Sequence, residues 1–138
     1  MKLSRTVSYA LQATLQLAET PSDVPVPCSQ LASRGQMPER FLLQILRHLV
    51  THGILRSTRG VDGGYTLERD PSDVSLLEVI EAIDGPISTV ASPTEGLCEK
   101  AQQRLHNALV EVANHTRQEL AAIKLVHLMK PAKPRQSA

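Results

Sequence analysis

Arginines and glycines cluster in the stretch RSTRGVDGGYTLER, which begins at Arg56. Arg56 and Arg59 both come before a turn that contains three glycines, Gly60, Gly63 and Gly64. A dinucleotide-binding loop needs the spacing G-x-G-x-x-G between a strand and a helix, so that helix amides point at the pyrophosphate. The glycines here are spaced differently, and the residues after them alternate between apolar and polar as in a strand. The stretch is therefore predicted to be a β-hairpin and not a nucleotide-binding loop.

A hairpin of this composition suits contact with a negatively charged partner. Because glycine has no Cβ, Gly60 and Gly63 permit a tight turn and a close approach of the backbone to a ligand. An arginine on such a tip can enter the narrow minor groove of DNA, where the negative potential is enhanced. Arg56 and Arg59 are therefore candidate minor-groove residues. The alternative is a solvent-exposed hairpin with incidental arginines, and the elements before it must decide between the two.

A second candidate surface lies on the stretch PERFLLQILRHLVTHG, which predicts a helix from Pro38 to His52. Its apolar residues recur at spacings of three and four and should face the core: Phe41, Leu42, Ile45, Leu46 and Leu49. The opposite face carries four residues that could read DNA: Arg40, Leu43, Gln44 and Arg47. Arginine pairs with the acceptor edge of guanine, glutamine with adenine, and an exposed leucine can meet a thymine methyl group.

Three cations are predicted to contact phosphates rather than bases: Lys2 and Arg5 near the start of the chain, and Arg47 further along the candidate helix. The alternative interpretation of this helix is an ordinary solvated face, since charged residues usually lie at the surface. The exposed Leu43 and a short helix before it favour DNA binding.

The element order places these residues on a known scaffold. A helix is predicted over Leu3–Glu19, followed by a proline-rich loop with a brief extended segment at Val24–Val26. A short helix Ser29–Arg34, ended by Gly35, is joined by GQMP to the helix that stops at Gly53. Two strands, Ile54–Thr58 and Tyr65–Arg69, complete the order. Helix, short helix, helix and hairpin predict a mainly α fold, a winged helix-turn-helix with the hairpin as its wing.

The second half of the chain is predicted to be helical as well. Ser75 caps a helix that runs to Asp84, with Glu78 at the capping-box position and Gly85-Pro86 as the stop. A loop follows, and then one long helix over Lys100–Met129. The predicted organisation is a DNA-binding domain at 1–85, a sensor-type loop at 86–99, a dimerisation helix at 100–130 and a flexible tail at 131–138.

Composition and charge agree with such a protein. With one Phe, two Tyr and no Trp, the core must be aliphatic, which suits packed helices. Neither a membrane span nor a signal peptide is predicted, and two cysteines are too few for a disulfide framework, so we expect a cytoplasmic protein. Residues 1–69 hold eight Lys/Arg and five Asp/Glu, which is compatible with a nucleic-acid surface.

The chain resembles the family of bacterial winged-helix repressors that includes the iron–sulfur cluster regulator and the nitric-oxide-sensing repressor. The resemblance rests on the stretches MKLSRTVSYALQATLQLA, PERFLLQIL and RGVDGGYTLERDPSDVSLLEVIEAIDGPI, and it continues at ELAAIKLVHL in the final helix. It implies a homodimer in which long carboxyl-terminal helices cross between subunits. A stripe on the final helix independently favours a partner helix: Leu105, Leu109, Val112, Thr116, Leu120 and Ile123.

The resemblance also exposes a difference in the loop before the long helix. Cluster-binding members carry three cysteines there, often with a histidine. This chain has Cys98 alone, with His106 near the histidine position and Gln103 where the third cysteine would stand. Since an iron–sulfur cluster needs about four ligands, usually thiolates, the sequence favours no bound cofactor.

Three interpretations of this loop stay open. Cys98 and His106 are ordinary residues, or Cys98 is a thiol sensor that is oxidised or forms a disulfide across the dimer. In the third interpretation, Cys98 and His106 bind a metal or an atypical cluster together with Glu95, Glu99 or groups from a partner chain. Cys28 precedes the short helix and is predicted to be a packed residue and not a ligand.

The sequence therefore predicts a homodimeric DNA-binding transcriptional regulator, a repressor that binds a palindromic operator in double-stranded DNA. No catalytic constellation is visible, so an enzyme is not expected. The competing class is a winged-helix module that binds a protein partner and not DNA.

Overall fold

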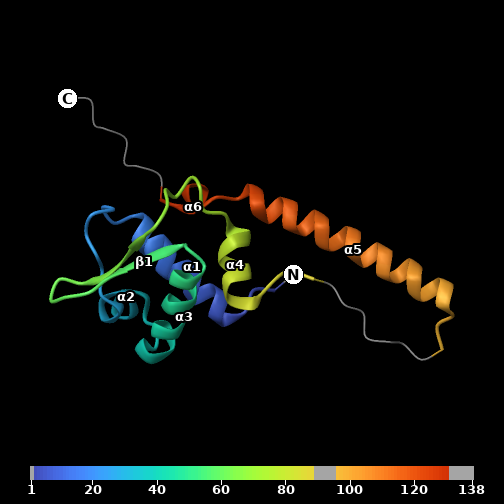
Figure 1. Ribbon diagram of the computed structural model, residues 1–138, viewed down its shortest axis with the longest axis horizontal. Helices are drawn as coiled ribbons and strands as arrows, with labels where there is room; N and C mark the ends of the chain where they lie inside the picture. Colours follow the sequence, from blue (N-terminus) through green and yellow to red (C-terminus); the bar gives the residue numbers. More distant parts are fainter. Residues whose placement is uncertain (1, 89–95, 131–138) are drawn as a thin grey trace, which may run out of the picture.

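The computed structural model describes residues 2–88 and 96–130 (Figure 1). Their elements follow the order α1 (Arg5–Ala18), α2 (Cys28–Gly35), α3 (Glu39–Thr51), β1 (Leu55–Thr58), β2 (Gly64–Leu67), α4 (Leu76–Asp84), α5 (Glu99–Ala122) and α6 (Leu125–Leu128). The predicted mainly α fold with one small hairpin is confirmed. We call α1 to α4 the winged-helix body and the β1–β2 hairpin the wing.

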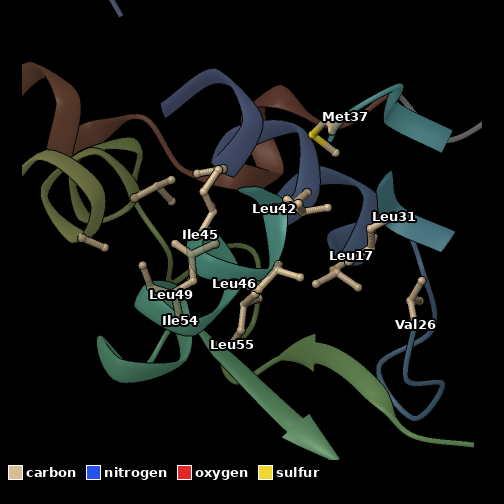
Figure 2. Close-up of a cluster of buried hydrophobic side chains, with 14 of the residues drawn as sticks. Leu17, Val26, Leu31, Met37, Leu42, Ile45, Leu46, Leu49, Ile54 and Leu55 are labelled. Carbon is tan, nitrogen blue, oxygen red and sulfur yellow. The ribbon is translucent and has the colours of Figure 1, made fainter. Parts of the chain in front are cut away.

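An aliphatic core holds the body together. Helix α3 points Leu42, Ile45, Leu46 and Leu49 into it, each at most 2% exposed, which confirms four of the five residues of the predicted stripe (Figure 2). They pack with residues of α1, α2 and the loop before α2, labelled Leu17, Leu31 and Val26 in Figure 2. Burial of such side chains contributes about 1.5–3 kcal/mol each.

Phe41 is the exception in that stripe. Its side chain is 40% exposed, and its ring packs edge-on against Tyr9 of α1, with 5.9 Å between the ring centroids. The prediction that Phe41 faces the core is wrong because the side chain lies at the edge of the apolar stripe, where α3 meets α1. An aromatic pair covers this edge and leaves part of the ring in solvent.

The turn between α2 and α3 differs from the predicted glycine cap. Gly35 is the last residue of α2, and Gln36 adopts the left-handed conformation, with φ 53°. Two backbone bonds close the turn, and one of them joins Met37 N to Ala32 O at 2.9 Å. A Cβ at Gly35 would lie 2.6 Å from the Met37 side chain. A side chain at position 35 would therefore require the end of the Met37 side chain to move, and Gln36, not Gly35, takes the left-handed backbone position.

The wing is an antiparallel pair in which Leu55 faces Leu67 and Thr58 faces Gly64. A hydrogen bond from Glu68 N to Ile54 O, at 3.0 Å, continues this pairing past the strand ends. Val26 pairs with Tyr65 from the other side, which confirms the short extended segment predicted before α2. Tyr65 and Leu67 pack against the core, as their alternation predicted. The hairpin is thus anchored at its base to the body.

Helix α4 begins with the predicted capping box. Glu78 N donates to Ser75 Oγ at 3.1 Å, and Ser75 N donates to Glu78 Oε2 at 2.9 Å. Both interactions satisfy amides that the first turn of a helix leaves free. The helix ends before Gly85, whose φ of 81° suits glycine.

The prediction of one helix over Lys100–Met129 is wrong. Helix α5 ends at Ala122, and Ile123 is extended, with φ −87° and ψ 113°. The chain then runs beside the residues that precede α4: Leu76 N donates to Ile123 O at 2.8 Å and Leu125 N to Val74 O at 2.9 Å. Leu125 becomes fully buried in the core of the body. Tertiary pairing and burial override the helical periodicity here.

Some predictions fall outside the described residues. These are the part of the sensor-type loop at 89–95, which includes Glu95, and the tail 131–138. The division of the chain at 85, 99 and 130 stays a prediction. None of the helices in the described ranges has the length and apolarity needed to cross a membrane.

Candidate DNA-binding surface

The outward face of α3 carries the residues predicted to read bases, together with Arg47, which is predicted to contact a phosphate. Arg40, Gln44 and Arg47 are exposed, about one helical turn apart in sequence, on the side opposite the buried leucines. Leu43 is half-buried, not exposed as predicted, because it lies where this face meets the apolar stripe. No ion pair among the described residues involves Arg40 or Arg47. Both guanidinium groups can therefore meet an anion.

The tip of the wing presents one unpaired arginine. Arg59 is exposed, and within the described ranges no ion pair involves it. Gly60 follows with φ 120°, and Gly63 N donates to Gly60 O at 3.0 Å to close the turn. A Cβ at Gly63 would clash with the Thr58 carbonyl oxygen. The glycines are thus required for a tip that projects Arg59 away from the body.

Arg56, also predicted to enter the minor groove, is already engaged. Its Nε donates to Glu68 Oε2 at 2.7 Å and its Nη2 to Glu68 Oε1 at 2.9 Å, so the two side chains form a bidentate pair across the hairpin. Glu68 was not among the residues predicted for this site. The signal for it was the strand register: Arg56 faces Thr66, and Glu68 is the diagonal neighbour of Arg56 on the same face.

Tyr65 of the wing is half-buried and lies near ionisable groups of α2 and α3. Burial raises the pKa of the Tyr65 hydroxyl, the nearby Cys28 raises this pKa further, and the Arg47 guanidinium opposes both effects. Arg47 therefore lies close enough to β2 for its charge to act on the wing. Cys28 is half-buried, and its Sγ–H donates to Glu39 O at 3.7 Å. Burial, with the Glu39 charge, raises the pKa of the Cys28 thiol, which agrees with a packed residue and not with a metal ligand.

The other predicted phosphate contacts lie near the start of the chain. Arg5 is exposed and begins α1, immediately after its N-cap residue Ser4. Lys2 lines a groove of about 390 Å³ between α4 and α5, together with Asp84. Lys2 therefore borders α5, and an involvement in DNA binding stays a prediction for both residues.

Cys98 and His106 lie on the exposed amino-terminal half of α5. Cys98 is the N-cap residue, and His106 follows eight residues later, which is about 12 Å along a helix axis. Metal–ligand bonds are about 2.0–2.3 Å long, so these two side chains of one chain are too far apart to bind one ion together. In the described part of the chain, no group of three or more His, Cys, Asp or Glu residues could hold a metal. These residues do not fit the usual ligand set of an iron–sulfur cluster.

A short helix, a tight turn, a helix with an exposed cationic face and a glycine-tipped hairpin together define a winged helix-turn-helix protein. Residues 3–131 match the model of the Rrf2 family, described as iron-dependent transcriptional regulators, and the chain belongs to this family. The family resemblance seen in the sequence is confirmed.

Individual relatives agree with this assignment. A helix-turn-helix-type regulator of Mycobacterium tuberculosis (strain CDC 1551 / Oshkosh) is 39% identical over 90 residues, which are 65% of this chain and 56% of the relative. The rrf2-like regulator of Rhodobacter capsulatus is 36% identical, with 80% of each chain covered. The solved structure of T. potens IscR superposes with a TM-score of 0.74 at 27% identity, over 100% of this chain and 93% of the other. The matched region thus spans just over half of the mycobacterial relative.

These relatives are transcriptional regulators and not enzymes, as the sequence predicted. They lend no support to a winged-helix module that binds only protein.

Proposed function

We propose that this chain is a homodimeric transcriptional repressor that binds a palindromic operator through α3 and the wing. One observation carries the proposal: two elements present exposed arginines that form no ion pair with any described residue. These are the outward face of α3, with Arg40 and Arg47, and the glycine tip of the wing, with Arg59. Arg40 and Gln44 would read base edges in the major groove, with Leu43 beside them, while Arg59 would enter the minor groove. Arg47 and Arg5 would contact phosphates.

The proposed dimer rests on the surface of α5. Helix α5 extends away from the body (Figure 1). Leu105 and Val112 are seven residues apart and so lie on one face of this helix, and they are 38 and 56% exposed. Val112 also lines the groove between α4 and α5, with Leu3 and Ile80. A partner's α5 would cover this stripe and the groove beside it. A two-fold dimer presents two α3 helices, which requires half-sites separated by whole turns of DNA.

Repression by such a dimer requires access to the chromosome, so the proposed place of action is the cytoplasm of a bacterial cell. An operator-bound dimer would act by occupying promoter DNA.

The regulatory signal is proposed to act without an iron–sulfur cluster of the usual kind, although the family is described as iron-dependent. This rests on the ligand set: Cys98 stands alone before α5, and His106 is two helical turns away. The exposed Cys98 thiol is the candidate redox site. A metal held between Cys98 and His106 of two subunits is the competing proposal.

DNA binding is tested by a gel shift with genomic fragments at rising salt. We expect affinity to fall steeply, because each phosphate contact releases counterions. Arg40→Ala and Arg59→Ala should each weaken binding, by about 1–3 kcal/mol for a lost base contact. Arg104→Ala, which removes the same charge on the exposed face of α5, is the matched control. Absence of binding at low salt by both reduced and oxidised protein would contradict the proposal.

The cofactor proposal is tested on protein purified without oxygen. We expect no visible absorption of an iron–sulfur cluster and no stoichiometric iron, with DNA binding intact. A coloured, iron-containing dimer would overturn it. If oxidants change DNA binding, Cys98→Ser should abolish that response, and an unchanged response in this variant would exclude the Cys98 thiol as the sensor.

A further inference from the structure

Three arginines of the wing region differ in how they are held. Arg59 at the tip takes part in no ion pair within the described ranges. Arg69, at the base, donates to Glu78 Oε1 at 2.6 Å and so ties the wing to α4. Arg56 lies between them, exposed on β1, and forms an ion pair with Glu68, which directly follows the other strand of the hairpin. The Arg56 guanidinium therefore lies on the wing, which is proposed to face DNA, but it is already paired with the Glu68 carboxylate.

In the Arg56–Glu68 pair, the carboxylate binds the guanidinium with two hydrogen bonds, as two oxygens of a DNA phosphate could. Two N–H···O bonds of 2.7 and 2.9 Å use Nε and Nη2 of the guanidinium, an edge that could otherwise bind two phosphate oxygens. Glu68 itself is positioned by its backbone, because Glu68 N donates to Ile54 O at 3.0 Å. The Glu68 hydrogen bond raises the pKa of Arg56, and the Arg56 hydrogen bond lowers the pKa of Glu68. Both groups are thus stabilised in their charged forms.

The pair is also exposed enough to be exchanged. The Arg56 side chain is 63% and the Glu68 side chain 38% exposed. An ion pair in water contributes little, because solvent screens it and holding two long side chains costs entropy. A DNA phosphate that approaches the wing can therefore compete for Arg56. As long as Arg56 stays paired with Glu68, it neutralises no phosphate and so releases no counterion from the DNA.

We propose that Glu68 is an internal competitor of the DNA backbone for Arg56, and that it lowers the affinity of the wing for phosphates. This inference rests on the proposed DNA-binding function. Because sequence-independent binding consists almost entirely of phosphate contacts, Glu68 weakens binding to non-operator DNA. Arg59 forms no ion pair with a carboxylate in the part of the chain that the structure describes, so its charge is available for the minor groove. Glu68 is thus a residue that sets affinity and specificity without itself binding DNA.

The experiment uses fluorescence anisotropy with a labelled random-sequence 30-base-pair duplex, so that no operator is needed. Glu68→Gln should bind this duplex about two- to fivefold more tightly at low salt, the gain expected from releasing an exposed ion pair. The slope of log affinity against log salt should become steeper by about 0.9, because one more phosphate contact forms. Glu119→Gln removes the same charge from an exposed site on α5 and should change neither quantity.

The variant Arg56→Gln separates the mechanism from a loosened hairpin. It breaks the same ion pair but frees no arginine, so it should bind no more tightly than the wild type. The double variant Arg56→Gln/Glu68→Gln should bind the duplex no more tightly than Arg56→Gln. If Glu68→Gln still increases the affinity when Arg56 is absent, Glu68 acts by repelling phosphates directly, and this would overturn the inference.

Two further outcomes are distinguishable. If the wild type binds DNA with a steep salt dependence and Glu68→Gln matches it, the inference fails while the proposed function stands. If the wild type shows no salt-sensitive binding, the proposed function fails and the inference fails with it. Thermal melting of each variant confirms that all of them are folded.

Discussion

The winged-helix body and helix α5 bury their apolar residues in different ways. Helix α3 has 13 residues and buries Leu42, Ile45, Leu46 and Leu49 within its own chain. Helix α5 has 24 residues and buries Ala113 and Leu120, while Leu105, Val110 and Val112 stay exposed. The body is therefore stable through contacts inside one chain. We propose that the exposed apolar side chains on one face of α5, Leu105 and Val112, complete their packing against another molecule.

The largest effect is expected for a leucine in the core of the body. Leu49→Ala should lower the free energy of unfolding by about 2–5 kcal/mol, because it removes a fully buried side chain and leaves a cavity. Urea denaturation monitored by circular dichroism measures this. The matched substitution Leu105→Ala on α5 should cost much less at protein concentrations where the chain is monomeric. If both variants lose the same free energy of unfolding, the apolar residues of α5 are packed within one chain as well as those of the body.

A charge on the exposed stripe of α5 should break the proposed dimer. Val112→Asp would place a carboxylate in an apolar contact, and we expect the dimer dissociation constant to rise about ten- to a hundredfold. Sedimentation velocity at several concentrations measures it. Gln118→Glu adds a similar charge on the opposite side of the helix and should leave the dimer intact. Unchanged association of Val112→Asp would show that this stripe is not the interface.

A smaller loss is expected at the cap of α4. Ser75→Ala removes the hydroxyl that accepts from Glu78 N at 3.1 Å, and should cost about 1 kcal/mol of stability. Thermal unfolding measures this loss. The control is Ser29→Ala in α2, where the side chain is exposed and the effect should be close to zero. A Ser75→Ala variant as stable as the wild type would mean that water replaces the cap.

The smallest effect is a pH dependence from Glu78. Burial raises the pKa of Glu78, but hydrogen bonds from Ser75 and Arg69 outweigh burial and hold this pKa below its usual value. A lowered pKa contributes stability that is present above the unfolded value, about 4.3, and is lost as the pH falls through the folded value. Because the side chain is 39% exposed, solvent screening keeps this term below about 1 kcal/mol. In Glu78→Gln, the free energy of unfolding should fall less between neutral and acidic pH, by up to that amount, as measured by urea denaturation at several pH values. The same fall as in the wild type would show that Glu78 does not contribute to the pH dependence.

Sequence patterns were most reliable where the cause is local. The capping box of Ser75 and Glu78 involves residues three apart, so the start of α4 could be predicted from residue types alone. The buried stripe of α3 follows from helical periodicity, and the structure confirms it except at Phe41. The family resemblance extended these local predictions to the whole chain, and the match over residues 3–131 confirms it.

The missed features depend on residues far apart in the chain. Nothing near Ala122 marks the end of α5; the helix ends there because Ile123 and Leu125 bond to residues near Val74. The pairing of Arg56 with Glu68 depends on the register of the hairpin, which decides which side chains become neighbours. The roles of the DNA-facing residues stay predictions until they are tested by substitution.

The sequence determined the class of this protein, because helical periodicity, helix caps and glycine spacing are local properties that specify a winged helix-turn-helix. Only the tertiary structure decided which of its charges are available. Of the two arginines predicted for the minor groove, Arg59 is unpaired in the described chain and Arg56 is neutralised by a carboxylate twelve residues away. Residue types give the number of charges, but their electrostatic effect depends on distances of a few ångströms that folding alone creates.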